Sequence, residues 1–146
     1  MTTKVLQIAI PFVWFGLVAG LSFLEAPLKF QAPGITLPLG LGIGRLVFYA
    51  LNKIEIVLAL SLIVTFWFVR PKGKPAVVTA AIVLFILLLQ TIWLLPILDV
   101  RAEQVIAGTA EPGSSAHIIY IVLEAVKLLA LLVLGAALAR EHLNFK

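Results

Sequence analysis

Residues 76–98 read AVVTAAIVLFILLLQTIWLLPIL, a run without a charged side chain that is long enough to cross a lipid bilayer. Outward from this run, Val5–Leu24, Ile56–Val69 and Leu128–Ala139 are also free of charge. Hydrophobic residues make up 62% of the 146-residue chain, against about 45–50% in a typical soluble protein. The sequence therefore predicts an all-α, polytopic membrane protein folded as a bundle of four transmembrane helices.

Turn-forming residues indicate where these helices begin and end. Pro71 cannot continue the second helix, and Pro75 suits the first turn of the third. Ser114 or Ser115 can cap the fourth helix. We predict a single membrane domain over residues 1–146, with spans at about 5–27, 44–69, 76–98 and 116–139.

Glycine and proline patterns add two local expectations. Phe30–Gly44 is apolar but rich in both residues, and it is too short to span the membrane. We expect it to be an irregular loop that lies at the interface or dips back against the bundle. Gly16 and Gly20 form a GxxxG pattern, which predicts close packing of the first helix against a neighbour.

The positions of the basic residues predict the orientation in the membrane. Lys and Arg are enriched in cytoplasmic loops. Three of them lie in the link 70–75, and Lys4 and Arg140 lie near the two termini, on the same side of a four-span protein. We therefore expect a bacterial-type inner membrane protein with both termini in the cytoplasm. The net charge of +4 is explained by this topology, so no nucleic-acid partner is predicted.

Polar residues are concentrated in the outer half of the predicted bundle. With a rise of about 1.5 Å per residue, Lys53, Glu55, Glu124 and Lys127 lie near the bilayer centre. A lone charge there costs roughly 2.5–3.5 kcal/mol, so we expect all four to face the interior and to find polar partners. The candidate ligand- or ion-binding residues are Glu25, Arg45, Asn52, Lys53, Glu55, Gln90, His117, Tyr120, Glu124 and Lys127.

Two interpretations of this polar set stay open. The charges can form internal salt bridges that fix the helix arrangement. They can also line a functional cavity open to the outer side, which we favour because buried ion pairs stabilise proteins poorly compared with apolar packing. Intramembrane ionisable residues are functional candidates in general.

The sequence predicts neither a metal site nor a catalytic residue set. The chain has no cysteine, which excludes thiolate ligands and iron–sulfur clusters. Glu25, Glu55, His117 and Glu124 are ligand types that suit iron, manganese or zinc. However, the Glu-x-x-His pairs of di-iron bundles are absent, and two lysines would oppose a cation. The identity of a cofactor is left open.

Three classes of function compete. The leading hypothesis is binding of a small ligand, ion or proton, most plausibly for transport. A membrane-embedded enzyme or a quinone- or cofactor-binding protein is the second class, and a small accessory subunit of a larger membrane complex is the third. The sequence shows no evident internal repeat, and four spans are few for a transporter. Besides the lipid bilayer, we therefore expect a homodimer or a larger complex as the partner.

Three segments carry a family resemblance: WFGLVAGLSFLEAPLKF, GIGRLVFYALNKIEIVLAL and SSAHIIYIVLEAVKLLALLVLG. They resemble small uncharacterised bacterial four-helix membrane proteins, like the domain of unknown function in transmembrane-protein-205-like proteins. That pattern has an alanine-proline and a phenylalanine at the end of helix one, here Ala26, Pro27 and Phe30, and a histidine at the start of helix four, here His117. The resemblance implies the four-helix fold and no reaction.

Overall fold

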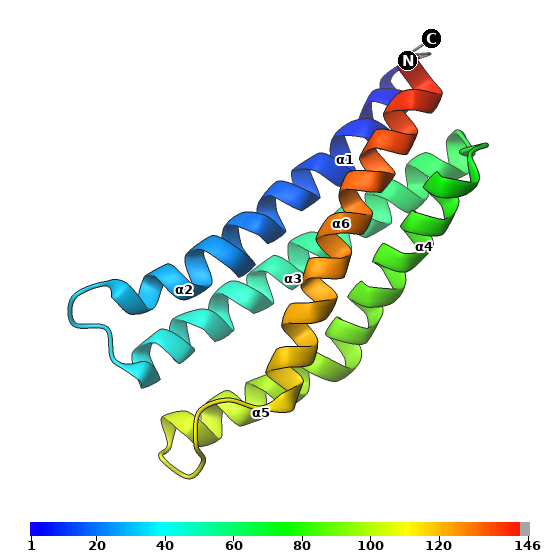
Figure 1. Cartoon of the computed structure of the whole chain (residues 1–146). Coiled ribbons are helices and arrows are strands. Elements are labelled where there is room, and N and C mark those ends of the chain that lie inside the picture. Colours follow the sequence, from blue (N-terminus) through cyan, green and yellow to red (C-terminus); the bar gives the residue numbers. More distant parts are fainter. Residues whose placement is uncertain (144–146) are drawn as a thin grey trace.

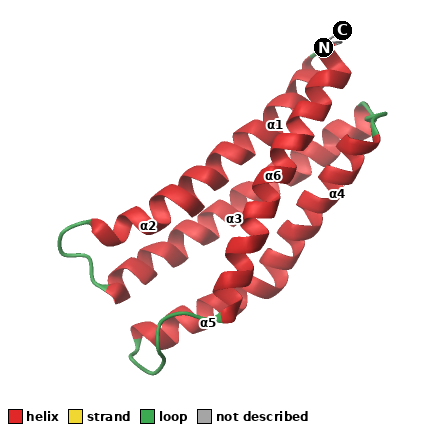
Figure 2. Ribbon diagram, viewed as in Figure 1, coloured by secondary structure: helices red, strands yellow, loops and turns green. Residues whose placement is uncertain are grey.

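The computed structural model describes residues 1–143, and it confirms the all-α class (Figure 2). Four continuous helical segments are long and apolar enough to cross a membrane, so the chain is a multi-pass membrane protein. Each predicted span is matched by one segment, and the segments are longer than predicted. They run over Thr2–Gln31, Leu37–Phe68, Lys74–Ile106 and Ser115–Leu143.

Two of the four segments change their helical type along their length. The first consists of α1 (Thr2–Val18), a π-helical segment η1 (Ala19–Glu25), α2 (Ala26–Leu28) and a 3₁₀ turn (Lys29–Gln31). The third consists of α4 (Lys74–Leu89), a π-helical segment η3 (Gln90–Leu94) and α5 (Leu95–Ile106). The second and fourth segments are the uninterrupted helices α3 (Leu37–Phe68) and α6 (Ser115–Leu143).

The bundle consists of two helical hairpins that pack together at one end, while at the other end α2 and α6 separate and α3 and α5 stay in contact (Figure 1). The first hairpin contains α1, α2 and α3, and the second contains α4, α5 and α6. Both chain termini lie at the end where the hairpins pack together (Figure 1). We call the half of the bundle near the termini the proximal half, and the other the distal half.

Each π-helical segment is explained by a proline that follows it. Pro27 and Pro96 lie two residues after the ends of η1 and η3. Since proline has no N–H, it cannot donate to the carbonyl four residues earlier, which belongs to Phe23 or Ile92 inside the π-helical segment. Such local widening of a helix is frequent at functional sites.

Corresponding features of the two hairpins recur at one fixed interval, from which we infer an internal repeat that was not evident from the sequence alone. Pro27 and Pro96 are 69 residues apart, and so are the last residues of the two π-helical segments, Glu25 and Leu94. Glu55 and Glu124 on the returning helices are separated by the same 69 residues. The repeat is difficult to recognise in the sequence because most aligned positions hold interchangeable apolar residues.

The hydrophobic core fills the proximal half. Its fully buried side chains come from α1, α3, α4 and α6 and include Trp14, Val18, Leu62, Val83, Leu131 and Leu134. The proximal half also holds two buried polar residues that were not predicted, Gln7 and Thr65. Gln7 donates to the carbonyl oxygens of Thr65 (2.9 Å) and Val69 (2.8 Å), which satisfies the end of α3.

The predicted irregular loop at Phe30–Gly44 is wrong, because α3 already begins at Leu37. Thr36 caps the helix by accepting from the Leu39 N–H, and Pro38 lies in its first turn. Gly40 permits close packing, because a Cβ added there would collide with the ring of Phe30.

Two other local expectations had opposite outcomes. Gly16 and Gly20 have no neighbour within 4 Å of where a Cβ would stand, so their predicted close packing is wrong within the described chain. The predicted cap of the fourth helix is confirmed: Ser114 Oγ accepts from the backbone N–H of His117 at 3.2 Å.

Candidate functional site

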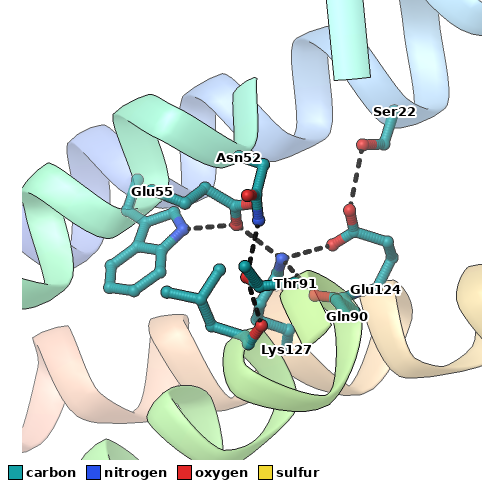
Figure 3. A network of polar contacts seen from close by, with 9 residues as sticks. Ser22, Asn52, Glu55, Gln90, Thr91, Glu124 and Lys127 are labelled. Carbon is teal, nitrogen blue, oxygen red and sulfur yellow. Dashed lines mark hydrogen bonds and ion pairs between the residues drawn. The ribbon is translucent and has the colours of Figure 1, made fainter. Parts of the chain in front are cut away.

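Lys127 on α6 is the centre of a buried polar cluster at the junction of the two halves (Figure 3). Its ammonium group is fully buried and has three acceptors. Nζ lies 2.5 Å from Glu55 Oε1, 2.9 Å from Glu124 Oε2 and 2.8 Å from Gln90 Oε1. The contact with Gln90 Oε1 is a hydrogen bond, and the contacts with the two carboxylates are ion pairs.

Glu55 on α3 has a second donor besides the lysine. The indole Nε1 of Trp14 donates to Glu55 Oε1 at 2.7 Å, and both side chains are buried. The carboxylate is therefore held between α1 and α6 by one hydrogen bond and one ion pair, as a buried charge requires. Trp14 was not predicted as a site residue, because a tryptophan in an apolar run is usually part of the core.

Glu124 on α6 is less completely satisfied. Its Oε1 accepts from Ser22 Oγ in η1 at 3.3 Å. Its Oε2 forms the ion pair with Lys127, but the geometry of this contact is not that of a hydrogen bond. This oxygen therefore has no hydrogen-bond donor among the described residues. Glu124 can therefore accept one further hydrogen bond or a proton.

Two amides complete the cluster from both hairpins. Asn52 Nδ2 donates to Thr91 Oγ1 at 2.8 Å, which links α3 to η3. Gln90 gives its oxygen to Lys127, but its buried Nε2 has no acceptor among the described residues. Ser22, Gln90 and Thr91 all lie in the π-helical segments, so both helix irregularities deliver side chains to this cluster.

The charges of the cluster do not cancel. It holds two carboxylates, Glu55 and Glu124, and a single cation, Lys127. With both carboxylates ionised, the buried cluster carries one surplus negative charge. A buried charge without a partner is costly, so the cluster favours a proton or a positively charged group from outside.

A cavity of about 560 Å³ lies in the distal half between the two hairpins. Its walls are mainly apolar and come from all four helical segments, with Phe23, Phe30, Leu41, Phe48, Leu98 and Ile121 among them. Along the four segments, the lining residues closest to the proximal half are Ser22, Tyr49, Leu95 and Glu124. Glu124 thus belongs both to the buried cluster and to the floor of the cavity.

Ion pairs surround the distal part of this cavity. Arg45 on α3 bridges to α5 through Asp99 (Nε to Oδ1, 2.5 Å) and Glu103 (Nη2 to Oε1, 2.6 Å). Within the first segment, Lys29 pairs with Glu25 at 3.3 Å. The predicted site residues Arg45 and Glu25 are therefore both paired. The Arg45 group is half-exposed and holds one cation and two carboxylates, whereas the same set of charges at the floor is fully buried.

The structure brings most of the predicted site residues together, with one clear exception. Asn52, Glu55, Gln90, Glu124 and Lys127 form the buried cluster. His117 and the buried Tyr120 line the cavity above Glu124.

The prediction for Lys53 is wrong. Its side chain is exposed on the outside of the bundle, and it forms no hydrogen bond or ion pair with residues 1–143. Asn52 and Glu55 share the inner face of α3, and a turn of about 100° per residue points Lys53 away from them. No neighbouring helix of the described chain covers α3 on that side.

The part of the chain that the structure describes contains no group of three or more His, Asp and Glu side chains arranged to hold a metal ion. The cluster instead pairs its carboxylates with lysine, tryptophan and serine.

A scan against protein-family models and searches of curated proteins and solved structures found no match to this chain. The fold and the site geometry are therefore the basis for a function, and the family resemblance stays a prediction.

The Trp14–Glu55 hydrogen bond leads to a first prediction. Trp14→Phe removes the indole donor and should lower the free energy of unfolding by about 1.5–3 kcal/mol, the range for a hydrogen bond to a charged group. Denaturation of the purified protein in detergent measures this loss. The control is Trp93→Phe, because Trp93 is exposed and forms no hydrogen bond within residues 1–143. Equal stability of both variants would show that this bond contributes nothing.

Proposed function

We propose that this membrane protein binds a small, apolar cation in its distal cavity, with transport across the membrane as its function. The proposal rests on Glu124, which belongs to two features at once. It lies at the floor of the cavity, and it is part of the buried cluster that carries one surplus negative charge when both carboxylates are ionised. A ligand with an apolar body and a positive head would match the walls and the floor of the same cavity.

The size and chemistry of the cavity support a small ligand. Ligand pockets usually enclose about 300–1,000 Å³, with mainly apolar walls and few polar groups, and this cavity of about 560 Å³ lies within that range. A cationic head would be attracted to Glu124 by charge, and a protonated amine could in addition donate to Glu124 Oε2, which has no hydrogen-bond donor among the described residues. Ser22 and Tyr120 also line the cavity with hydroxyl groups.

The internal repeat supports transport rather than binding alone. Transporters are often built from two repeats with the binding site between them, near the middle of the membrane, where helices are interrupted. Here Glu55 and Glu124 are equivalent residues of the two hairpins, and both π-helical segments contribute to the cluster. The packed core of the proximal half closes the other side of the site. Transport would then require the hairpins to rock against each other.

Uptake into proteoliposomes tests this function. We expect labelled octyltrimethylammonium, an apolar cation that crosses lipid slowly, to enter vesicles containing the protein faster than protein-free vesicles. Glu124→Gln should reduce the protein-dependent rate at least about tenfold, since it removes the surplus charge. Equal uptake with and without protein would refute transport, and equal uptake by wild type and Glu124→Gln would refute the site.

We further propose that the termini face the cytoplasm of a bacterial-type inner membrane. The basic residues of the link 70–75 support this orientation, and in the fold this link lies at the same end as both termini. Reporter fusions at the termini and after Lys74 should all give a cytoplasmic signal, and a fusion at Thr109 a non-cytoplasmic one. The opposite pattern would mean that the distal cavity opens toward the cytoplasm, contrary to the proposal.

A further inference from the structure

We infer that the outer face of α3 binds a transmembrane helix of a second protein, one that carries an aspartate or glutamate at the bilayer centre. The reason is Lys53, an exposed lysine that the fold of this chain leaves in the middle of a membrane span. This inference is independent of the proposed transport function.

The depth of Lys53 makes its exposure costly. It lies 16 residues from Leu37 and 15 from Phe68, the two ends of α3, so it is about 23 Å from either end. Only one residue lies between it and Glu55, so it has the depth of the buried cluster. A lysine at the centre of a span costs roughly 2.5–3.5 kcal/mol on insertion scales. A carboxylate at the same depth would remove this cost.

Lys53 lies in the middle of an otherwise apolar, exposed stripe along α3, which we call the seam. Its residues recur at alternating intervals of four and three, the spacing of one face of a helix. Ala50, close to Lys53, is small and permits close approach of another helix. A single charged residue in such a seam fixes the partner and its register. The seam consists of Leu46, Ala50, Lys53, Val57, Leu60, Val64 and Trp67.

The second hairpin provides an internal reference for this face. Through the 69-residue repeat, Lys53 corresponds to Val122 on α6, which is also exposed. The residues that follow on that face are apolar as well: Val126, Leu129 and Val133. This is the composition of a surface covered by lipid. The equivalent face of α3 differs from this face of α6 because it carries a lysine, Lys53, near the middle of the helix.

A second copy of this chain does not supply the missing carboxylate. All seven acidic residues of the sequence lie within the described part. Glu55 and Glu124 are buried, and the other five lie in the rim, the distal loop or the proximal end. A symmetric dimer through the seam would also bring two Lys53 side chains together. Charge complementarity therefore points to a different membrane protein.

Photo-crosslinking in native membranes tests the inference. A photoreactive amino acid replaces Ala50 in the full-length protein, and crosslinked peptides are sequenced by mass spectrometry. We expect a transmembrane peptide with Asp or Glu within about one turn of the crosslinked residue. Its yield should fall at least tenfold with Lys53→Leu and persist with Lys53→Arg. Lys53→Glu should restore it when the partner's acidic residue is changed to lysine.

The same photoreactive residue at Ile119, on the reference face of α6, is the matched control and should crosslink to lipid alone. Since Lys53 is exposed, Lys53→Leu should elute like wild type on size exclusion, which separates loss of binding from loss of folding. Adducts at position 50 with lipid alone, with another copy of this chain or with a helix lacking an acidic residue would overturn the inference. An absence of adducts would overturn it too.

Discussion

Replacement of Lys127 by methionine should destabilise the protein more than replacement of any other residue of the buried cluster. Methionine fills a similar volume but leaves Glu55 and Glu124 buried without a cation. Breaking a buried ion pair by removing one partner typically costs about 3–5 kcal/mol, and two carboxylates lose their partner in this case. We expect a corresponding loss in the free energy of unfolding in detergent, or failure of the variant to accumulate in the membrane.

Two further variants separate the charge effect from the loss of packing. Glu55→Gln and Glu124→Gln added to Lys127→Met should recover much of the stability, because the glutamines keep the partners Trp14 and Ser22 without a net charge. Lys53→Met is the matched control and should leave the stability unchanged, since this lysine is exposed. Equal losses for Lys127→Met and Lys53→Met would contradict the central position of Lys127 in the fold.

Glu124→Gln should abolish the preference of the cavity for a cation. Octylammonium stays protonated at neutral pH, as a lysine side chain does, and octanol is its neutral counterpart. The wild-type protein in nanodiscs of neutral lipid should bind octylammonium more tightly than octanol. In Glu124→Gln its affinity should fall about 10- to 100-fold, the equivalent of one hydrogen bond to a charged group, while the affinity for octanol should change little.

Glu124→Gln is a suitable test because the charges of the buried cluster cancel in this variant. With Gln at position 124, Glu55 and Lys127 form a neutral pair, so the fold is expected to persist. Glu111→Gln in the distal loop removes the same charge away from the cavity and should bind octylammonium like wild type. If both variants bind it equally well, Glu124 does not recognise the ligand.

The sequence was sufficient to predict the fold class and most residues of the buried polar cluster. Charge-free runs of membrane length identify four helices, because few other structures tolerate them. The cost of charge in lipid correctly placed Glu55, Glu124 and Lys127 inside the bundle with polar partners. These predictions depend on physical penalties that are large and independent of the neighbouring residues.

The errors arose where the position of neighbouring helices decides the outcome. The free-energy cost of a charge in lipid predicts that Glu124 lies inside the bundle, but it does not reveal which side of α3 lacks a neighbouring helix. Lys53 was therefore predicted to lie inside as well. Ser22 and Trp14 look like ordinary residues of an apolar run, and only the packing of η1 and α1 directs them to the two carboxylates. The prolines Pro27 and Pro96 were the one local signal for the π-helical segments, and their 69-residue spacing was the signal for the repeat.

The most direct test is the accessibility of a single cysteine at the cavity floor. The natural chain has no cysteine, so Ser22→Cys introduces a unique thiol beside Glu124. A membrane-impermeant thiol reagent should label it from the side opposite the termini, and octylammonium should slow the labelling where octanol does not. Ala130→Cys, in the buried core, is the control that should stay unlabelled. Labelling of position 22 from the side of the termini only, or at a rate unaffected by octylammonium, would contradict a distal cation-binding cavity.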